Sequence, residues 1–278
     1  MTHTAPELTL NSGYTIPQLG LGVFRVAQDD AQRVVAEALE IGYRHIDNAA
    51  VYRNEEGAGR ALAESGIPRE ELFVTTKLWN TEQGAEAPRP ALEESLRKLG
   101  LDYVDLYLIH WPAPQRNLYV ESWQALERLR DEGLVRSIGV SNFEPEHLDR
   151  LAQHSAVLPA VNQVELHPAF QQRTLRDFQE PRGILTQAWG PLGQAKYPLE
   201  DMPGLANLAA KHSKTLAQVV LRWHLHEGLI VFPKTTKTER LVENFDVSDF
   251  ELDADDMAKM RAMDQGMRVG THPNEGNW

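Results

Sequence analysis

Three stretches of the chain decide its fold: Gly42-Tyr-Arg-His-Ile-Asp47, Leu72-Phe-Val-Thr-Thr-Lys77 and Val104-Asp-Leu-Tyr-Leu-Ile-His110. Each is largely apolar, has the length of a buried β-strand, and ends in a polar side chain. Helix-like segments separate the three. In a parallel α/β barrel the carboxyl ends of the strands converge on one face. We therefore expect Asp47, Lys77 and His110 to meet there, together with Tyr52, which follows Asp47 closely.

The same alternation continues along the chain. Strands are expected at residues 19–22, 43–47, 72–77, 104–110, 135–140, 160–165, 184–188 and 229–232. Helices are expected at residues 30–41, 55–65, 88–99, 120–132, 144–153, 205–212, 215–226 and 253–263. Leu8-Thr-Leu and Tyr14-Thr-Ile flank Asn11-Ser-Gly13, which indicates a β-hairpin before the first strand. Eight strands joined by helical crossovers indicate an α/β fold, a (β/α)8 TIM barrel formed as a single domain by residues 1–278.

Composition excludes several classes of function. With 28 basic and 40 acidic residues, the formal net charge is −12. Such a balance argues against a nucleic-acid groove or an anionic membrane surface as partner. The absence of cysteine excludes disulfides, thiolate metal sites and cysteine nucleophiles. No signal-peptide pattern or membrane-spanning apolar run is evident, so we expect a cytoplasmic protein. We also expect it to act as a monomer.

A doubly wound dinucleotide-binding fold is the main alternative for an α/β chain. The Gly-x-Gly-x-x-Gly fingerprint of that fold could begin at two places in the chain, but it is incomplete at both. Gly20-Leu-Gly22 is followed by Arg25 where the third glycine belongs, and Gly57-Ala-Gly59 is followed by Leu62. Any nucleotide must therefore be held in another way.

The four converging residues suit proton donation to a carbonyl. Tyrosine has a usual pKa of about 10, and an ammonium within hydrogen-bond reach lowers it. Lys77 supplies that ammonium, Asp47 holds it in place, and His110 donates a second hydrogen bond to a substrate oxygen. Each residue alone has a structural explanation, such as a strand end or a core hydrogen bond. As a group of four they favour polarisation and protonation of a carbonyl as hydride arrives.

At these residues the chain resembles the aldo-keto reductases, and most of all their bacterial members similar to 2,5-diketo-D-gluconate reductase. The matching segments run through nearly the whole chain: GYRHIDNAAVYRNEE at 42–56, DYVDLYLIHWP at 102–112, GVSNF at 139–143, NQVE at 162–165 and PKTTKTER at 233–240. The resemblance implies an NADPH-dependent oxidoreductase that reduces aldehydes, ketones or keto-sugar acids to alcohols without a metal, with Tyr52 as general acid. Asn48 and Arg53 depart from the common pattern, and Arg53 bears on the identity of the substrate.

The resemblance also implies NADPH (or NADP⁺) lying extended across the top of the barrel. Ser141, Asn142 and Gln163 carry groups suited to the nicotinamide carboxamide, and Trp189 offers a flat face for stacking. The structural alternative for Trp189 is a buried core residue. The next loop lets the backbone approach the pyrophosphate closely, through Gly190, Pro191, Leu192, Gly193 and Gln194.

A basic segment follows the last expected strand. Cations beside backbone amides at a helix start would bind the 2′-phosphate of NADPH; the candidates are Lys234, Thr235, Thr236, Lys237 and Arg240. Glu243 and Asn244 match family residues near the adenine. A solvated charge run is the structural alternative.

The substrate pocket is expected beside the four polar residues. Phe24, Trp79 and Trp111 each follow a strand and would form apolar walls next to His110, although each could instead pack under a loop. Residues 266–278 have the composition of a loop, and in the family a C-terminal loop covers this pocket. Arg268 and His272 in that segment would suit an acidic group on the substrate.

Two other functions remain open from the sequence. A metal-dependent barrel hydrolase would use His45, Asp47, His110 and His167, but zinc requires three or four convergent ligands and His45 has no evident partner. A subunit that binds NADPH as a sensor, without turnover, would carry the same cofactor motifs.

Overall fold

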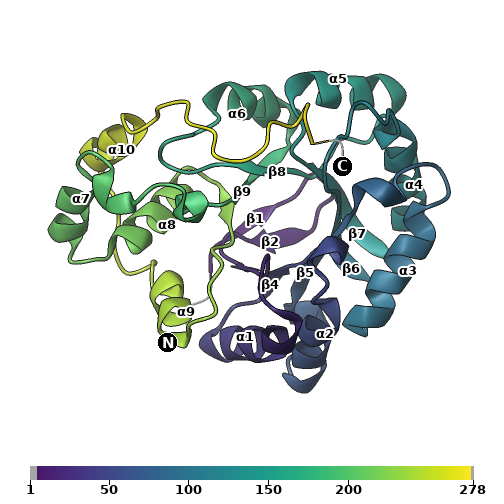
Figure 1. The fold of residues 1–278 in the computed structure, drawn as a ribbon, viewed down its shortest axis with the longest axis horizontal. Coiled ribbons are helices and arrows are strands. Elements are labelled where there is room, and N and C mark those ends of the chain that lie inside the picture. Colours follow the sequence, from purple (N-terminus) through teal and green to yellow (C-terminus); the bar gives the residue numbers. More distant parts are fainter. Residues whose placement is uncertain (1–4, 277–278) are drawn as a thin grey trace.

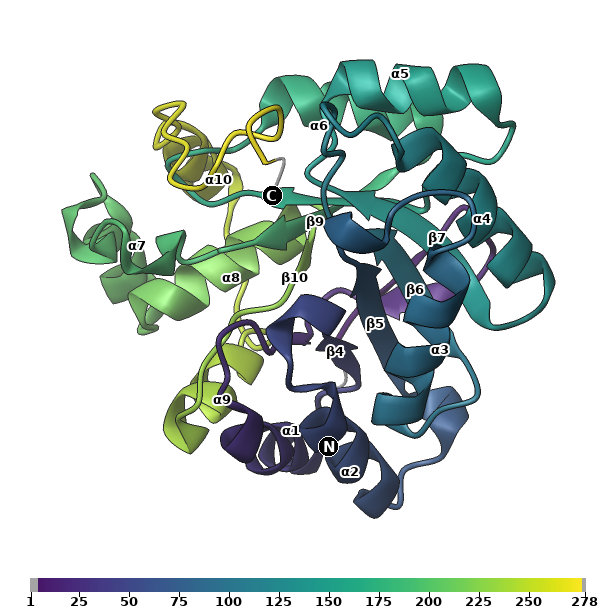
Figure 2. The same ribbon diagram turned by 45° about the vertical axis from the view of Figure 1, so that its right-hand side comes forward.

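The computed structural model describes residues 5–276, which form a ring of parallel strands surrounded by helices (Figures 1 and 2). The strands are hydrogen-bonded in the order β10-β9-β8-β7-β6-β5-β4-β3, so each lies beside its neighbour in the chain. A parallel bridge between Leu19 and Val231 joins the first strand to the last. The predicted (β/α)8 barrel is confirmed.

Each strand lies within one residue of its predicted range. They are β3 (Leu21–Gly22), β4 (His45–Asp47), β5 (Phe73–Leu78), β6 (Val104–Ile109), β7 (Val135–Ser141), β8 (Val161–Glu165), β9 (Leu185–Trp189) and β10 (Ile230–Val231). Nearly all of their residues are buried, because helices cover one side of the sheet and the barrel interior lies on the other. The polar residues at the strand ends are therefore exceptions that call for a function.

Most helices also agree with the prediction: α1 (Gln28–Ile41), α2 (Glu55–Glu64), α3 (Pro88–Leu99), α4 (Tyr119–Asp131), α5 (Pro145–His154), α7 (Leu205–His212), α8 (Leu216–His226) and α10 (Ala254–Arg261). Capping boxes begin α8 at Thr215 and α10 at Asp253. Within residues 5–276, no helix is both long enough and apolar enough to span a membrane.

Two helices were not among the predicted stretches, α6 (Arg173–Gln179) and α9 (Thr238–Phe245). The first buries only Leu175 and Gln179, and the second only Leu241 and Asn244. Both are short, seven and eight residues, and α9 begins within the basic segment that was interpreted as a phosphate site.

The predicted hairpin is confirmed as β1 (Glu7–Thr9) and β2 (Thr15–Pro17), which pair antiparallel. Leu10 and Ile16 belong to one buried cluster with interior residues of the barrel, including Leu106, Leu108, Val161 and Ile230. The hairpin therefore fills the end of the barrel where the strands begin. A ligand must approach from the opposite end, where the strands finish.

The segment after α10 forms a loop, as predicted. In both views it runs, in yellow, from α10 past the ends of β8 and β9 (Figures 1 and 2). It is attached at several points, for example by Arg268 Nη2, which donates to Glu144 Oε1 at 3.1 Å, and by Asn80 Nδ2, which donates to the Gly276 carbonyl at 3.3 Å. Of the predicted loop 266–278, residues 277 and 278 lie outside the described residues. We call residues 266–276 the tail.

Candidate active site

The structure brings the four candidate catalytic residues together. Asp47 ends β4, Lys77 lies near the end of β5, and His110 directly follows β6. Tyr52 ends a short 3-10 turn, η1 (Ala50–Tyr52), which follows β4. Parallel pairing of β4 with β5 and of β5 with β6 holds the strand ends side by side.

A buried ion pair forms the base of the site. The side chain of Lys77 is fully buried, and its Nζ donates to Asp47 Oδ2 and to the Asn48 carbonyl, both at 2.7 Å. Gln163 Nε2 donates to the other oxygen of Asp47 at 2.9 Å. Burial lowers the pKa of Lys77, and the carboxylate of Asp47 opposes that shift. Because Asn48 contributes its backbone carbonyl here, its departure from the family pattern leaves this contact intact.

Tyr52 lies above this pair, with Lys77 Nζ 5.1 Å from the centre of its ring. Burial raises the pKa of Tyr52 well above its usual value, and the charge of Asp47 adds to the shift. The expectation that Lys77 would lower this pKa is wrong for this structure, because burial dominates and the ammonium donates to Asp47 and Asn48. The phenol is therefore protonated at neutral pH, which is the form that a proton donor requires.

His110 faces Tyr52, with ring centres 5.7 Å apart. Burial lowers the pKa of His110 well below its usual value, and Lys77 adds to the shift, so the imidazole is neutral at pH 7. Its Nδ1 is buried and has no hydrogen-bond partner within residues 5–276. A neutral imidazole carries one N–H, so His110 is suited to donate a hydrogen bond and not to act as a cationic acid.

All three candidate substrate residues border this cluster. Phe24 packs on Tyr52 with ring centres 5.1 Å apart, and Trp79 packs edge-on against His110 at 5.2 Å. Trp111 lies against the tail: a Cβ at position 276 would be 2.7 Å from Trp111 Cε3. Aromatic surfaces thus adjoin the phenol and the imidazole.

The candidate nicotinamide residues lie on the three strands that come next. Ser141 ends β7, Asn142 follows it in a left-handed conformation (φ 63°), Gln163 is in β8, and Trp189 ends β9. They are bonded to one another: Trp189 Nε1 donates to Asn142 Oδ1 at 2.8 Å, and Ser141 Oγ donates to the Gln163 carbonyl at 2.8 Å. These groups fit an amide ligand, since a carboxamide N–H can replace the indole N–H on Asn142 Oδ1.

The candidate phosphate residues lie at the start of α9 and in the loop after β9. Gly190 and Gly193 have positive φ, 64° and 71°, so that loop turns sharply. Lys234, Lys237 and Arg240 are exposed, and none of them forms an ion pair with a carboxylate within residues 5–276. Three such cations in a chain of net charge −12 fit a ligand phosphate beside a helix start.

The remaining candidates of this segment differ in exposure. Thr235, Asn244 and Pro191 are buried, and Thr236 and Leu192 are half-buried. Glu243 already accepts a hydrogen bond from Thr215 Oγ1 at 2.6 Å. Gln194 has a positive φ of 51° within the loop after β9.

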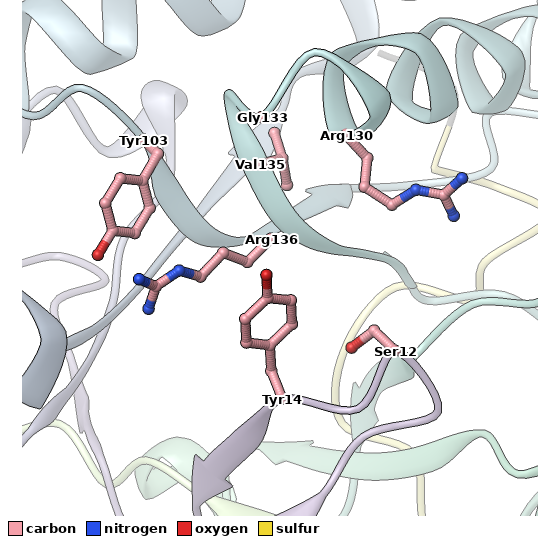
Figure 3. A pocket seen from close by; sticks show the side chains of 7 residues that line it. All are labelled: Ser12, Tyr14, Tyr103, Arg130, Gly133, Val135 and Arg136. Carbon is pink, nitrogen blue, oxygen red and sulfur yellow. The ribbon is translucent and has the colours of Figure 1, made fainter.

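A hollow of about 490 Å³ lies at the other end of the barrel, where β6 and β7 begin. Figure 3 shows Arg136 between Tyr103 and Tyr14, and its guanidinium carbon lies 4.2 and 5.4 Å from the two ring centres. Arg136 pairs with Asp105 at 3.0 Å, and Arg130 pairs with Asp131 at 2.7 Å. None of the candidate site residues lines this hollow, and its cations already have carboxylate partners.

The geometry does not favour the metal-hydrolase interpretation. His45 lies 3.2 Å from the Pro17 carbonyl through Nδ1 and 3.2 Å from Thr75 Oγ1 through Nε2. Burial lowers its pKa to about 4. Both ring nitrogens of His167 are also engaged, by Glu165 and Tyr197. Within residues 5–276 there is no cluster of three or more His, Asp or Glu side chains that could hold a metal ion.

Comparison with known proteins shows the family of this chain. The model of the Aldo/keto reductase family matches residues 18–265. An aldo-keto reductase of Mycolicibacterium smegmatis is 51% identical over 274 residues, covering 99% of each chain. The methylglyoxal reductase DkgA of Escherichia coli is 48% identical over 268 residues, covering 96% of this chain and 97% of its own.

Solved structures give the same result. The crystal structure of a Gox0644 mutant in complex with NADPH has a TM-score of 0.94 at 48% identity and covers 99% of this chain and 100% of its own. A Bombyx mori aldo-keto reductase in complex with NADP has a TM-score of 0.90 at 41% identity, covering 97% of this chain and 96% of its own.

The barrel fold and these matches define a carbonyl-reducing oxidoreductase that uses NADP(H). The chain belongs to the aldo/keto reductase family. The resemblance stated from the sequence is confirmed.

Sequence reasoning gave no role to Glu165 or to the glycines of the tail. Glu165 stands in the NQVE segment and ends β8, but it was quoted only as part of the match. In the structure it contacts the tail directly. The available signal was an acidic residue at the end of a predicted buried strand.

Proposed function

We propose that Tyr52, His110, Lys77 and Asp47 are the groups that carry out carbonyl reduction in this chain. NADPH supplies the hydride when it is bound. The Tyr52 hydroxyl donates its proton to the carbonyl oxygen, and neutral His110 donates a hydrogen bond to the same oxygen. The observation that supports this most is a protonated phenol and a neutral imidazole side by side above a buried ion pair.

Lys77 acts after the proton has left. The phenolate that forms lies near the Lys77 ammonium, whose Nζ is 5.1 Å from the centre of the Tyr52 ring. In a buried site that attraction is strong, because little solvent screens it. Asp47 keeps the ammonium charged and in position.

The side chains that line the pocket indicate the size and charge of the substrate. Phe24, Trp79 and Trp111 favour a small carbonyl compound with little charge, and a relative of this chain is named a methylglyoxal reductase. Arg268, which the sequence suggested for an acidic substrate, instead donates to Glu144 at 3.1 Å and stacks on Phe170 at 4.7 Å. We therefore place small reactive aldehydes and dicarbonyls ahead of keto-sugar acids.

The test is the loss of NADPH absorbance with a panel of methylglyoxal, other aldehydes, α-keto esters and keto-sugar acids. We expect turnover with methylglyoxal, unchanged by a chelator. An NADPH sensor would bind the cofactor and show no loss of absorbance with any carbonyl. A metal-dependent enzyme would lose its activity in the chelator.

We also propose that the tail covers the substrate pocket. The contact of Gly276 with Trp111 and the bond from Asn80 to the Gly276 carbonyl support this role. Deletion of residues 270–278 should raise KM for the carbonyl compound and leave NADPH affinity unchanged. An unchanged KM and an unchanged substrate ranking would mean that the tail does not cover the pocket.

The proposed form of the enzyme is a cytoplasmic monomer in which residues 1–278 make one catalytic domain. The absence of cysteine suits a reducing compartment. The net charge of −12 disfavours binding to nucleic acid. Light scattering of the purified protein at working concentration tests the monomer, and a mass of twice 31.4 kDa would contradict it.

A further inference from the structure

Glu165 binds the backbone of the tail. Its side chain is fully buried at the end of β8. One oxygen accepts from the Val269 N–H at 2.5 Å, and the other accepts from the Gly270 N–H at 2.8 Å. Burial acts to raise the pKa of Glu165, but the hydrogen bonds from His167, Val269 and Gly270 oppose it and the net pKa is lowered. The group is therefore an ionised carboxylate that only accepts hydrogen bonds.

The stretch of tail that Glu165 binds lies directly against the indole ring of Trp189, the residue expected to stack on the nicotinamide. A Cβ at position 270 would be 2.5 Å from Trp189 Cη2 and 2.6 Å from Glu165 Oε2. Only glycine allows so close an approach without displacement of a neighbour. The position of the tail is thus set by the carboxylate on one side and by Trp189 on the other.

The same carboxylate is linked to the loop after β9. His167 Nε2 lies 3.1 Å from Glu165 Oε1, and its Nδ1 lies 2.9 Å from the Tyr197 hydroxyl. Because Nε2 faces an ionised carboxylate, it carries the proton, and Nδ1 accepts from Tyr197. The Tyr197 ring in turn covers Gly193, where a Cβ would be 2.5 Å from Tyr197 Cε1. Gly193 belongs to the loop proposed to approach the pyrophosphate.

We propose that Glu165 is a positioning residue for substrate binding: it fixes the tail against Trp189 and, through His167 and Tyr197, ties that position to the cofactor loop. This inference rests on the proposed role of the tail as cover of the substrate pocket. It assigns the effect of Glu165 to KM for the carbonyl compound, since Glu165 donates nothing to the reacting atoms.

Two other side-chain attachments of the tail are open to solvent, whereas the bond from Asn80 to the Gly276 carbonyl is buried. Arg268 and Glu144 form a pair whose side chains are 19% and 17% exposed. Asn274 Nδ2 donates to Glu146 Oε1 at an exposed site. Solvent competes for both of these contacts, but it does not reach the carboxylate of Glu165.

The primary variant is Glu165→Gln in the full-length enzyme. The amide keeps one acceptor oxygen and presents an NH2 group where two backbone N–H groups and His167 require acceptors. We expect KM for methylglyoxal to rise about tenfold, with kcat little changed. Glu146→Gln is the matched control, because it alters an exposed carboxylate that contacts the same tail, and its KM should stay at the wild-type value.

Combining variants separates positioning from a structural effect. In the protein lacking residues 270–278, Glu165→Gln should cause little further rise in KM, because the segment proposed to cover the pocket is gone and only the Val269 N–H remains bound to Glu165. Equal effects of Glu165→Gln with and without the tail would overturn the proposal. Gly270→Ala should reproduce the rise in KM without any change at Glu165, and Tyr197→Phe should give a smaller rise in the same direction.

Hydrogen exchange provides a measurement that does not need turnover. In Glu165→Gln the amides of Val269 and Gly270 should exchange faster, and in Glu146→Gln they should keep their wild-type rates. Unchanged exchange in Glu165→Gln would overturn the proposal. If the wild-type enzyme reduced no carbonyl, the proposed function would fail, but the exchange result would still decide whether Glu165 holds the tail.

Discussion

Each end of this barrel contains a buried carboxylate paired with a cation, but within residues 5–276 the upper end, where the strands finish, has more buried polar atoms without a partner than the lower end, where they begin. Where the strands begin, Asp105 accepts from Arg69 at 2.7 Å, from the Val74 N–H at 2.8 Å and from Arg136 at 3.0 Å. Where they finish, Asp47 accepts from Lys77 and Gln163. The neighbouring atoms His110 Nδ1, Asn48 Oδ1 and Gln187 Nε2 have no partner within residues 5–276.

This difference separates structural from catalytic use of similar residues. A buried polar atom without a partner is costly, so a fold that keeps several of them together reserves them for a ligand. Within residues 5–276, the network around Asp105 leaves only Arg69 Nε without a partner, and that guanidinium is already bonded to the Leu72 and Tyr103 carbonyls and to Asp105. Variants at the two ends should therefore affect different properties, and the following predictions test that separation.

The largest expected effect is that of Lys77→Met on turnover. Without the ammonium, the phenolate of Tyr52 loses its nearby cation and Asp47 loses its main partner. We expect kcat for methylglyoxal to fall by about 10²–10⁴-fold. Lys98→Met, which removes a partly exposed lysine paired with Glu94, is the control and should retain full activity. A Lys77→Met enzyme with wild-type kcat would show that the Lys77–Asp47 pair is structural, as the ion pairs of Asp105 are.

At the lower end, where the strands begin, we expect a loss of stability without a loss of turnover. Asp105→Asn leaves Arg69 and Arg136 without their shared carboxylate, and both guanidiniums are partly exposed. We expect the free energy of unfolding to drop by about 2–4 kcal/mol, near the lower part of the range for a broken buried pair. Urea unfolding measures this loss, and kcat of the folded variant should match the wild type. A loss of kcat without a loss of stability would contradict the comparison.

Arg240→Gln tests the cofactor end of the site. Arg240 is exposed at the start of α9 and has no carboxylate partner in the described part of the chain. A charge-assisted hydrogen bond to phosphate contributes roughly 1.5–3 kcal/mol, so the Kd of NADPH should rise by about tenfold or more. NADH lacks the 2′-phosphate and serves as the internal control. Equal weakening of both cofactors in a fluorescence titration would mean that Arg240 does not contact that phosphate.

The smallest expected effect is that of pH on reduction. Burial raises the pKa of Tyr52 above its usual value, so the phenol keeps its proton throughout the neutral and mildly alkaline range. Burial lowers the pKa of His110, so the imidazole is already neutral below the usual pKa of histidine. We expect kcat/KM to stay level from about pH 6.5 to 9.5. A decline with an apparent pKa near 8 would mean that Lys77 lowers the pKa of Tyr52 once the cofactor is bound.

Much of the fold was predictable from the sequence, because parallel strands buried on both sides are short apolar runs separated by helical stretches. The ends of β4, β5 and β6 were equally clear, since Asp47, Lys77 and His110 interrupt such runs with charge or polarity. Helices α6 and α9 were missed, and both are short, with seven and eight residues. The number of buried residues does not explain the difference, because α10 also buries two residues and was predicted.

Two properties of the site could not be predicted from the sequence, for a shared reason. The direction of the pKa shift of Tyr52 depends on how completely the packed chain removes it from water, and no local pattern carries that information. Glu165 meets the backbone of the tail more than a hundred residues away, and backbone N–H groups have no sequence signature. Both properties arise only when distant segments pack together.

The central claim is that Tyr52 is the proton donor of the upper cluster. Single-turnover oxidation of bound NADPH by methylglyoxal in Tyr52→Phe tests it most directly, with the Kd of NADPH measured on the same sample. We predict that hydride transfer slows by about 10²–10⁴-fold while NADPH binds as in the wild type, because the phenol hydroxyl is lost and the cofactor contacts remain. A rate within about tenfold of the wild type would contradict the assignment, since general acid catalysis contributes more than that.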